Sequence, residues 1–207
     1  MKNRVNELLS DVKNPELKEK YRELILTLLE KGYFPGLEGV PVIKSGISHI
    51  DGEEGTLTYR GYPVQELAEY CTYEDICYLL IHGDLPLLKE RVQLRSELFA
   101  KKDLSESVSK VIMEMDENLQ PMYMLSSSVL LLQAEDQECA CVNDYILNYR
   151  RGLNLIGKLP SIIGVFRNKD ADFAAGKEFD SFAQYCLYVF NPGLAMDRNW
   201  VNVFEKI

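Results

Sequence analysis

The sequence is poor in the side chains that carry most acid-base chemistry. Only two histidines, His49 and His82, occur among its 207 residues, and neither has a recognisable partner motif nearby. A Gly-x-Ser-x-Gly nucleophile elbow and a phosphate-binding glycine-rich loop are also missing. We therefore expect neither an activated serine nor a nucleotide held by a glycine-rich loop.

Long apolar runs are missing as well. No stretch of the sequence approaches the roughly 18 apolar residues that a helix needs to cross a bilayer. Met1 is followed by Lys2-Asn3-Arg4 with no apolar segment behind it, so no secretory leader is expected. These features predict a cytoplasmic protein that does not interact with a membrane.

Paired cysteines and an excess of basic residues are absent too. The five cysteines are odd in number and show no Cys-x-x-Cys spacing, so we expect buried reduced thiols rather than disulfides or a zinc site. The acidic cluster of Asp51, Glu53 and Glu54 lacks the spacing of a calcium loop and predicts a solvated turn. The net charge of -9 argues against a nucleic-acid surface. We expect no metal, cofactor or nucleic acid.

What the sequence does contain is mostly helical patterning, in which apolar residues recur three and four positions apart. Residues 1–39 predict two amphipathic helices, broken at Asn14-Pro15, and a linker rich in Gly and Pro. Residues 40–207 predict one helical domain. The helical segments expected in the whole chain are 5–12, 17–29, 64–70, 72–83, 87–100, 105–119, 122–134, 145–166 and 179–190. The tail 194–207 shows no clear cap.

A small β-hairpin is expected near residues 43–60. Alternating apolar and polar residues predict a strand before Asp51-Gly52, and residues 56–59 predict the returning strand. Downstream, Thr72 and Asp75 have the spacing of a capping box, and Gly83 is a plausible helix end. Arg60 is expected to tie the hairpin to neighbouring helices through its five donors.

The stretch from Gly46 to Pro86, GISHIDGEEGTLTYRGYPVQELAEYCTYEDICYLLIHGDLP, resembles the amino-terminal signature of citrate synthases and 2-methylcitrate synthases. Weaker similarity continues through Pro121-Met122, residues 155–160 and residues 182–185. The resemblance implies a mainly α, multi-helical fold, corresponding to a fragment of the large domain of these enzymes. It covers only about the first half of the family's usual length.

The same resemblance implies a condensation of acetyl-CoA with oxaloacetate, yet the motifs that hold its acid and base groups are missing. Segments resembling HxDHxxNxST and GPxHGGA do not occur in this sequence. Residues 195–198 resemble the segment just before the first of these motifs, and residues 199–207 do not resemble the motif itself. We therefore predict no catalytic, cofactor-binding or metal-binding residues in this chain, and acetyl-CoA enters only as a substrate of the family. His49 is expected to have a packing or surface role, and His82 a role at a helix end.

The segment from Met122 to Ala134 differs from the other helical segments because it is almost uncharged on every side. A helix of this kind must be buried all round, either at the centre of a monomer's core or against another subunit. In citrate synthases the corresponding helix lies at the dimer interface. We therefore predict an interface with a second copy or a second citrate-synthase-like chain, formed by Met122, Leu125, Ser126, Val129 and Leu130.

Three interpretations of function remain open from the sequence. The favoured one is the amino-terminal part of a citrate-synthase-like acyltransferase that is inactive alone and has its catalytic half elsewhere. The second is a non-catalytic relative that binds a full-length citrate synthase and affects its assembly or regulation. The third is a gene remnant whose product merely folds.

Overall fold

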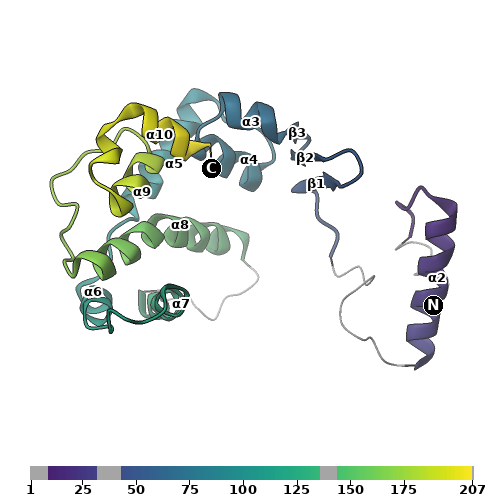
Figure 1. Cartoon of the computed structure of the whole chain (residues 1–207), viewed down its shortest axis with the longest axis horizontal. Helices are drawn as coiled ribbons and strands as arrows, with labels where there is room; N and C mark the ends of the chain where they lie inside the picture. The colour runs from purple at the N-terminus through teal and green to yellow at the C-terminus, as the bar shows by residue number, and fades with distance from the viewer. Residues whose placement is uncertain (1–8, 32–42, 136–143, 207) are drawn as a thin grey trace. The chain divides into compact units, whose positions relative to one another are not determined.

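The structure is a computed structural model that describes residues 9–31, 43–135 and 144–206. The chain separates into two compact units, residues 1–46 and residues 47–207, and each is described by itself. Figure 1 shows that the second unit is built mainly of helices with one small sheet. The predicted boundary between residues 39 and 40, most of the predicted helix 5–12 and Cys139 and Cys141 lie outside the described residues.

The first unit contains one long helix, α2, which spans Pro15–Lys31. Asn14 begins this helix, because its side-chain Oδ1 accepts the backbone N–H of Glu16 at 3.0 Å. Pro15 follows at the first helical position, where a missing N–H removes no helical hydrogen bond. The small core of the unit joins Ile25 of α2 to Leu9.

The second unit opens with a three-stranded antiparallel sheet of strands β1 (Ser48–Asp51), β2 (Thr56–Tyr59) and β3 (Tyr62–Pro63). The predicted hairpin is confirmed, although its first strand begins at residue 48 rather than 43. Asp51 closes the turn by accepting the N–H groups of Glu53 and Glu54, each at 3.0 Å.

The third strand was not predicted, because the expected hairpin ended near residue 60. Arg60 and Gly61 both have positive φ, 51° and 93°, so the chain reverses within two residues. Tyr62 then pairs with Tyr59. Glycine adopts this conformation without steric cost, whereas arginine does so only under the constraint of its surroundings.

Helices α3 (Val64–Tyr70) and α4 (Tyr73–His82) follow the sheet where they were predicted. The capping box before α4 is confirmed: the backbone N–H of Thr72 donates to the Asp75 carboxylate at 2.9 Å, and the Thr72 hydroxyl accepts the Asp75 N–H. Gly83 ends α4 in the left-handed conformation, with φ of 100°. Local sequence alone therefore specifies both ends of this helix.

Helices α5 (Leu88–Ala100) and α6 (Glu106–Met113) come next, and Ser105 caps α6 because its side chain accepts the N–H of Val108. The predicted helix 105–119 is too long, because α6 ends at Met113. Val108 and Ile112 are buried, whereas Val111 is 47% exposed.

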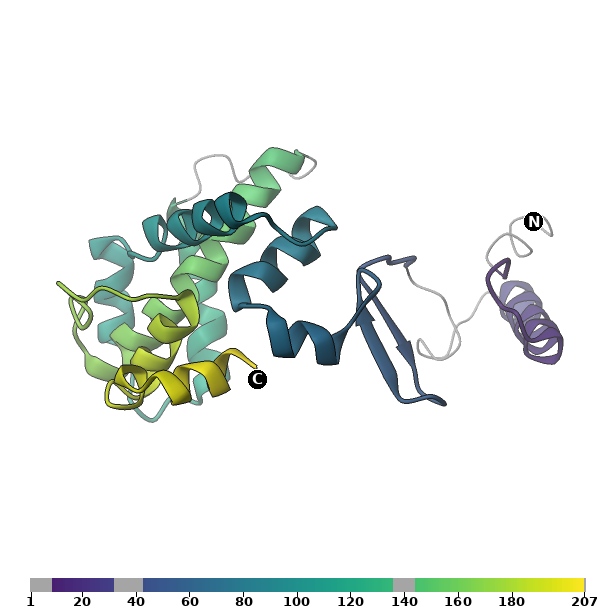
Figure 2. The ribbon, with the colours of Figure 1, turned by 90° about the horizontal axis from the view of Figure 1, so that it is seen from above.

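Helix α7 spans Pro121–Leu131 and passes into a 3-10 turn, η1, at Leu132–Glu135. Helix α8 (Tyr145–Asn168) is the longest, begins at the cap Asp144 and carries the buried Pro160 inside it as predicted. It contacts α5, α6, α7 and α9, so it is the central element around which the second unit packs (Figures 1 and 2).

The remaining elements are α9 (Phe182–Phe190), the 3-10 turn η2 (Leu194–Met196) and α10 (Arg198–Glu205). The prediction of an uncapped tail after residue 194 is wrong. Asp197 caps α10, because its Oδ1 accepts the N–H of Asn199 at 2.8 Å. Val201 buries the inner side of this helix against Leu187 and Ala195.

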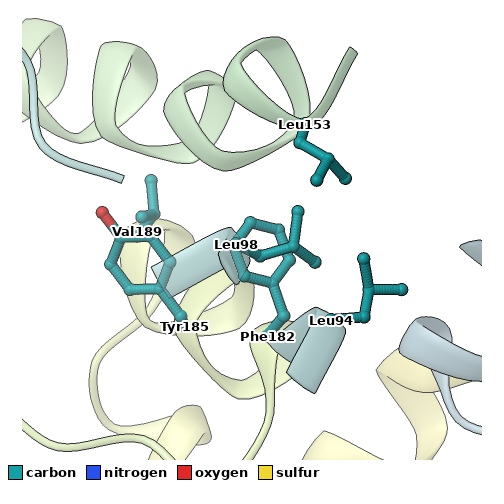
Figure 3. Packing of buried hydrophobic residues seen from close by; sticks show 6 residues of the cluster. All are labelled: Leu94, Leu98, Leu153, Phe182, Tyr185 and Val189. Carbon is teal, nitrogen blue, oxygen red and sulfur yellow. The ribbon is translucent and has the colours of Figure 1, made fainter. Parts of the chain in front are cut away.

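The main core of the second unit lies where α5, α8 and α9 meet. Figure 3 shows Leu94 and Leu98 of α5, Leu153 of α8, and Phe182, Tyr185 and Val189 of α9 directed toward one another. A second cluster joins α6, α7, η1 and α8 through Val108, Ile112, Met124, Leu132, Ile162 and Val165. Together the clusters confirm the predicted mainly α, multi-helical fold.

Candidate functional site

The two histidines lie apart, in different elements. His49 is exposed on β1, opposite Thr58 of β2. His82 is exposed in the last turn of α4, with its ring centroid 4.2 Å from that of Tyr78 and 5.6 Å from that of Tyr149. Neither histidine lines the three cavities described next. His49 was expected to have a packing or surface role and lies on the surface, and His82 lies at the helix end where it was expected.

The first cavity, of about 420 Å³, lies between α6, α8 and the loop of residues 171–177. The hydroxyl groups of Ser161 and Tyr185 are 2.7 Å apart in its wall, and the Ser161 hydroxyl also bonds the Lys102 carbonyl. Burial raises the pKa of Tyr185 to about 12, so the phenol stays protonated at neutral pH. This arrangement holds α8 and α9 together.

The second cavity, of about 370 Å³, is lined by charges of both signs from α4, α5 and α10 and by Asp180, which precedes α9. The buried Asp75 accepts a bond from Arg91 at 2.5 Å, and the buried Glu74 accepts the N–H of Phe182 at 2.9 Å. Glu205 also lines it, and burial, followed by the nearby Glu74, raises the pKa of its carboxyl group. These contacts connect α4 to α5 and α9, so the charged groups first serve the packing of the unit.

The third cavity, of about 260 Å³, lies between η1 and α8 beside an ion pair of the buried Lys158 and the half-buried Glu135. The Lys158 ammonium donates to Glu135 at 2.6 Å and to the carbonyl of Asp103 at 2.7 Å. Burial acts to raise the pKa of Glu135, but the bonds from Lys158 and Ser105 outweigh it and leave that pKa below its ordinary value. Sequence reasoning missed this pair, because Glu135 and Lys158 are 23 positions apart and no motif connects them.

The predicted interface helix α7 has an exposed side rather than being buried all round. Met122 is 62% exposed and Leu130 76% exposed, and Ser126 is exposed as well. The other two predicted interface residues, Leu125 and Val129, are half-buried and pack against the second core cluster. The alternative that α7 is the central core helix of a monomer is therefore wrong.

Arg60 has the structural role that was predicted for it. Its guanidinium Nη2 donates to the carbonyl of Leu80 at 2.8 Å, which ties the end of the hairpin to α4. Its Nε is buried and has no hydrogen-bond partner within the described part of the chain.

The described residues include no group of three or more His, Cys, Asp or Glu side chains placed to hold a metal ion. In the same ranges, no helix is both long enough and apolar enough to cross a bilayer.

Comparisons with known proteins identify first the class of fold. The solved structure of citrate synthase from Pyrobaculum aerophilum aligns with 83% of this chain and 45% of its own, with a TM-score of 0.69 and 28% identity. The fold is thus that of the all-α large domain of citrate synthases.

The sequence comparisons agree with the structural one. The family described as "Citrate synthase, C-terminal domain" matches residues 36–207. The citrate synthase of Haloferax volcanii is 35% identical over 162 residues, which are 75% of this chain and 42% of that protein. A 2-methylcitrate synthase of Mycobacterium tuberculosis is 31% identical over 130 residues, or 63% of this chain and 32% of that protein. The chain belongs to the citrate synthase family, and it spans less than half the length of these relatives.

Proposed function

We propose that this chain is one part of a citrate-synthase-like acyltransferase and that it is inactive without the part that carries the catalytic groups. The observation that carries the proposal is coverage: the chain corresponds to 42% of the Haloferax volcanii enzyme and 45% of the Pyrobaculum aerophilum structure. The reaction of the whole would be the condensation of acetyl-CoA with oxaloacetate, the entry step of the tricarboxylic acid cycle, in the cytoplasm.

The residues of the chain support inactivity in isolation. Condensation requires a base to remove a proton from the acetyl group and an acid within hydrogen-bond reach of the ketone. The two histidines are exposed in separate elements, and the tyrosine in the first cavity is held protonated. The HxDHxxNxST and GPxHGGA segments that hold these groups in the family do not occur in the sequence.

The exposed side of α7 supports association. Large apolar side chains on one helix, more than half exposed, form the kind of surface that a protein partner covers. We assign Met122, Ser126 and Leu130 to the contact, with Leu125 and Val129 supporting them from the side that packs on the chain's own core. The partner is a second copy of this chain or another citrate-synthase-like chain.

The test measures CoA release from acetyl-CoA and oxaloacetate. The isolated chain is expected to give none, and mixing it with a chain carrying HxDHxxN and GPxHGGA is expected to give turnover. Release by the isolated chain would contradict the assignment of the catalytic groups to another part. Binding to that partner without any gain in turnover would contradict the split-enzyme proposal.

A second candidate function is favoured by the same exposed side of α7. In it, the chain binds a full-length citrate synthase through Met122 and Leu130 and changes its assembly. Adding the chain to an active full-length enzyme separates the two functions. A changed rate or oligomeric state, reversed by Leu130→Glu, supports this candidate, whereas an unchanged enzyme contradicts it.

A further inference from the structure

Helix α10 is attached to the second unit by a small apolar contact. Its main neighbours are α9 and η2. Val201 is its one buried residue, and it packs on Leu187 of α9 and Ala195 of η2. An element with so few buried contacts opens locally at a lower free energy than the core helices do. The polar groups at the same contact therefore have a large influence on how firmly α10 is docked.

Two carboxyl groups meet where α10 approaches α4 and the start of α9. Glu205, in the last turn of α10, and Glu74 of α4 both line the second cavity. Glu205 accepts a hydrogen bond from the Ser181 hydroxyl. Glu74, which is 2% exposed, accepts the N–H of the next residue, Phe182, at 2.9 Å. Because the two carboxyl groups bond adjacent residues, they lie close together, and ionisation of both at once is unfavourable.

The two carboxyl groups lie at opposite kinds of helix end. Glu74 binds the amino-terminal end of α9, where the helix dipole favours an anion. Glu205 lies in the carboxyl-terminal turn of α10, where the dipole disfavours an anion and no lysine or arginine is present. Burial, followed by the nearby Glu74, raises the pKa of Glu205. Glu205 is therefore the member of this pair that takes up a proton first as the pH falls.

The other acidic groups near the cavity stay with the body of the unit or lie at the far end of α10. Asp75, on α4, is buried and paired with Arg91 at 2.5 Å. Asp180, which precedes α9, is exposed, and Asp197 caps the opposite end of α10. Helix α9 and the turn η2 contain no acidic or basic residue. Of these carboxyl groups, the one that leaves the cavity when α10 opens is Glu205.

The cations around the cavity do not reverse this effect. Arg95 donates to a backbone carbonyl. Arg198 is on α10 itself, seven residues before Glu205, which is about 10 Å along the helix axis. Lys206 is exposed to solvent. The attraction of Arg91 acts to lower the pKa of Glu205, but less than burial acts to raise it.

We propose that Glu205 makes α10 a pH-sensitive latch: the helix is docked firmly when Glu205 carries a proton and more loosely when Glu205 is ionised. Because the pKa of Glu205 is higher in the docked helix than its ordinary value of 4.5, its protonation stabilises docking fully below that value. This stabilisation is lost as the pH rises through the raised pKa. Opening of α10 uncovers the apolar seat formed by Leu187 and Ala195. The latch does not depend on the proposed function.

The test follows hydrogen exchange of the full chain from neutral pH down to pH 4.5, with the intrinsic effect of pH on exchange removed. The opening constant of α10 is read from the peptide that contains it, and that of α8 is the reference for unfolding of the whole unit. The variant Glu205→Gln keeps the size and the accepting oxygen of the side chain but cannot ionise. The control Glu117→Gln removes one negative charge from an exposed position outside the cavity.

The opening constant of α10 in the wild type and in Glu117→Gln is expected to fall severalfold relative to that of α8 as the pH falls to 4.5. The fall is at most about tenfold per pH unit, because a single proton is bound. In Glu205→Gln the constant is expected to be low already at neutral pH and to change little. A wild-type constant that does not fall, a pH dependence that survives in Glu205→Gln, or one that is lost equally in Glu117→Gln would each overturn the proposal.

Discussion

Helices α7 and α9 are alike in composition but differ in how much of each helix is buried. PMYMLSSSVLL and FAQYCLYVF both lack charged residues. Helix α9 buries five of its residues, among them Phe182 and Tyr185, whereas α7 buries only Met124 and Ser128. The side of α7 opposite its buried residues exposes Met122, Tyr123 and Leu130.

The difference shows that an uncharged helix does not by itself locate the core of a chain. Helix α9 fits between α4, α5 and α8, and its Phe182 ring stacks on the ring of Tyr73 in α4, with the centroids 5.8 Å apart. Helix α7 contacts α6 and α8 on one side and has no neighbour in the described residues for its other side. In α9, therefore, the apolar residues stabilise this chain, and in α7 they are available to a partner.

The contrast between α7 and α9 is tested most directly by truncating one large residue on each helix and comparing the loss of stability. Phe182→Ala is expected to cost about 3–5 kcal/mol of unfolding free energy, because the ring is 1% exposed and its loss leaves a cavity. Leu130→Ala, at 76% exposed, is expected to cost under about 0.5 kcal/mol. Chemical denaturation measures both values. Similar costs for the two variants would contradict the contrast between the helices.

The next largest change in stability is expected at the partly buried ion pair of Lys158 and Glu135. This pair joins α8 to η1, which follows α7. Lys158→Met leaves the Glu135 carboxylate without its cation and is expected to cost about 2–3 kcal/mol. A matched control is Lys110→Met, which breaks the exposed pair with Glu106 and should cost under about 0.5 kcal/mol. The double variant of Lys158→Met with Glu135→Leu should recover most of the loss. No recovery would mean that the lysine acts through packing alone.

The same pair predicts that the stability of the chain depends on pH through the Glu135 carboxyl group. Because the pKa of Glu135 is lower in the folded chain than its ordinary value of 4.5, its contribution to stability is complete above that value. It is lost as the pH falls through the folded pKa. The difference in unfolding free energy between the wild type and Glu135→Gln should thus be constant near neutrality and shrink below about pH 4.5. A difference that stays the same in acid would contradict the proposed role of the carboxylate.

Much of the fold could be predicted where local chemistry decides the structure. The capping box at Thr72, the terminating Gly83 and the turn at Asp51 each depend on residues within a few positions, and all three are present. The α10 cap at Asp197 uses the same local chemistry and was overlooked because only a short segment follows it. The tight reversal at Arg60 was not predicted, because arginine rarely adopts positive φ and its side chain bonds the carbonyl of Leu80, 20 positions away.

The candidate sites could be predicted less completely than the fold, because they depend on contacts between distant residues as well as on local sequence patterns. The absence of catalytic motifs and the unusual composition of α7 could both be read from the sequence. The pairing of Glu135 with Lys158 could not, since it arises only when η1 packs on α8. Which residues of α7 face outward also required the fold, because a helix uncharged on all sides gives no indication of its exposed face.

Sedimentation velocity of the purified chain and of the variant Met122→Glu with Leu130→Glu tests most directly whether α7 is an interface. The account predicts that the wild-type chain associates, that the charged variant shifts toward the monomer at the same concentration, and that both unfold with nearly equal free energies. A wild-type chain that remains a monodisperse monomer at high concentration, or a charged variant that associates as tightly as the wild type, would contradict it.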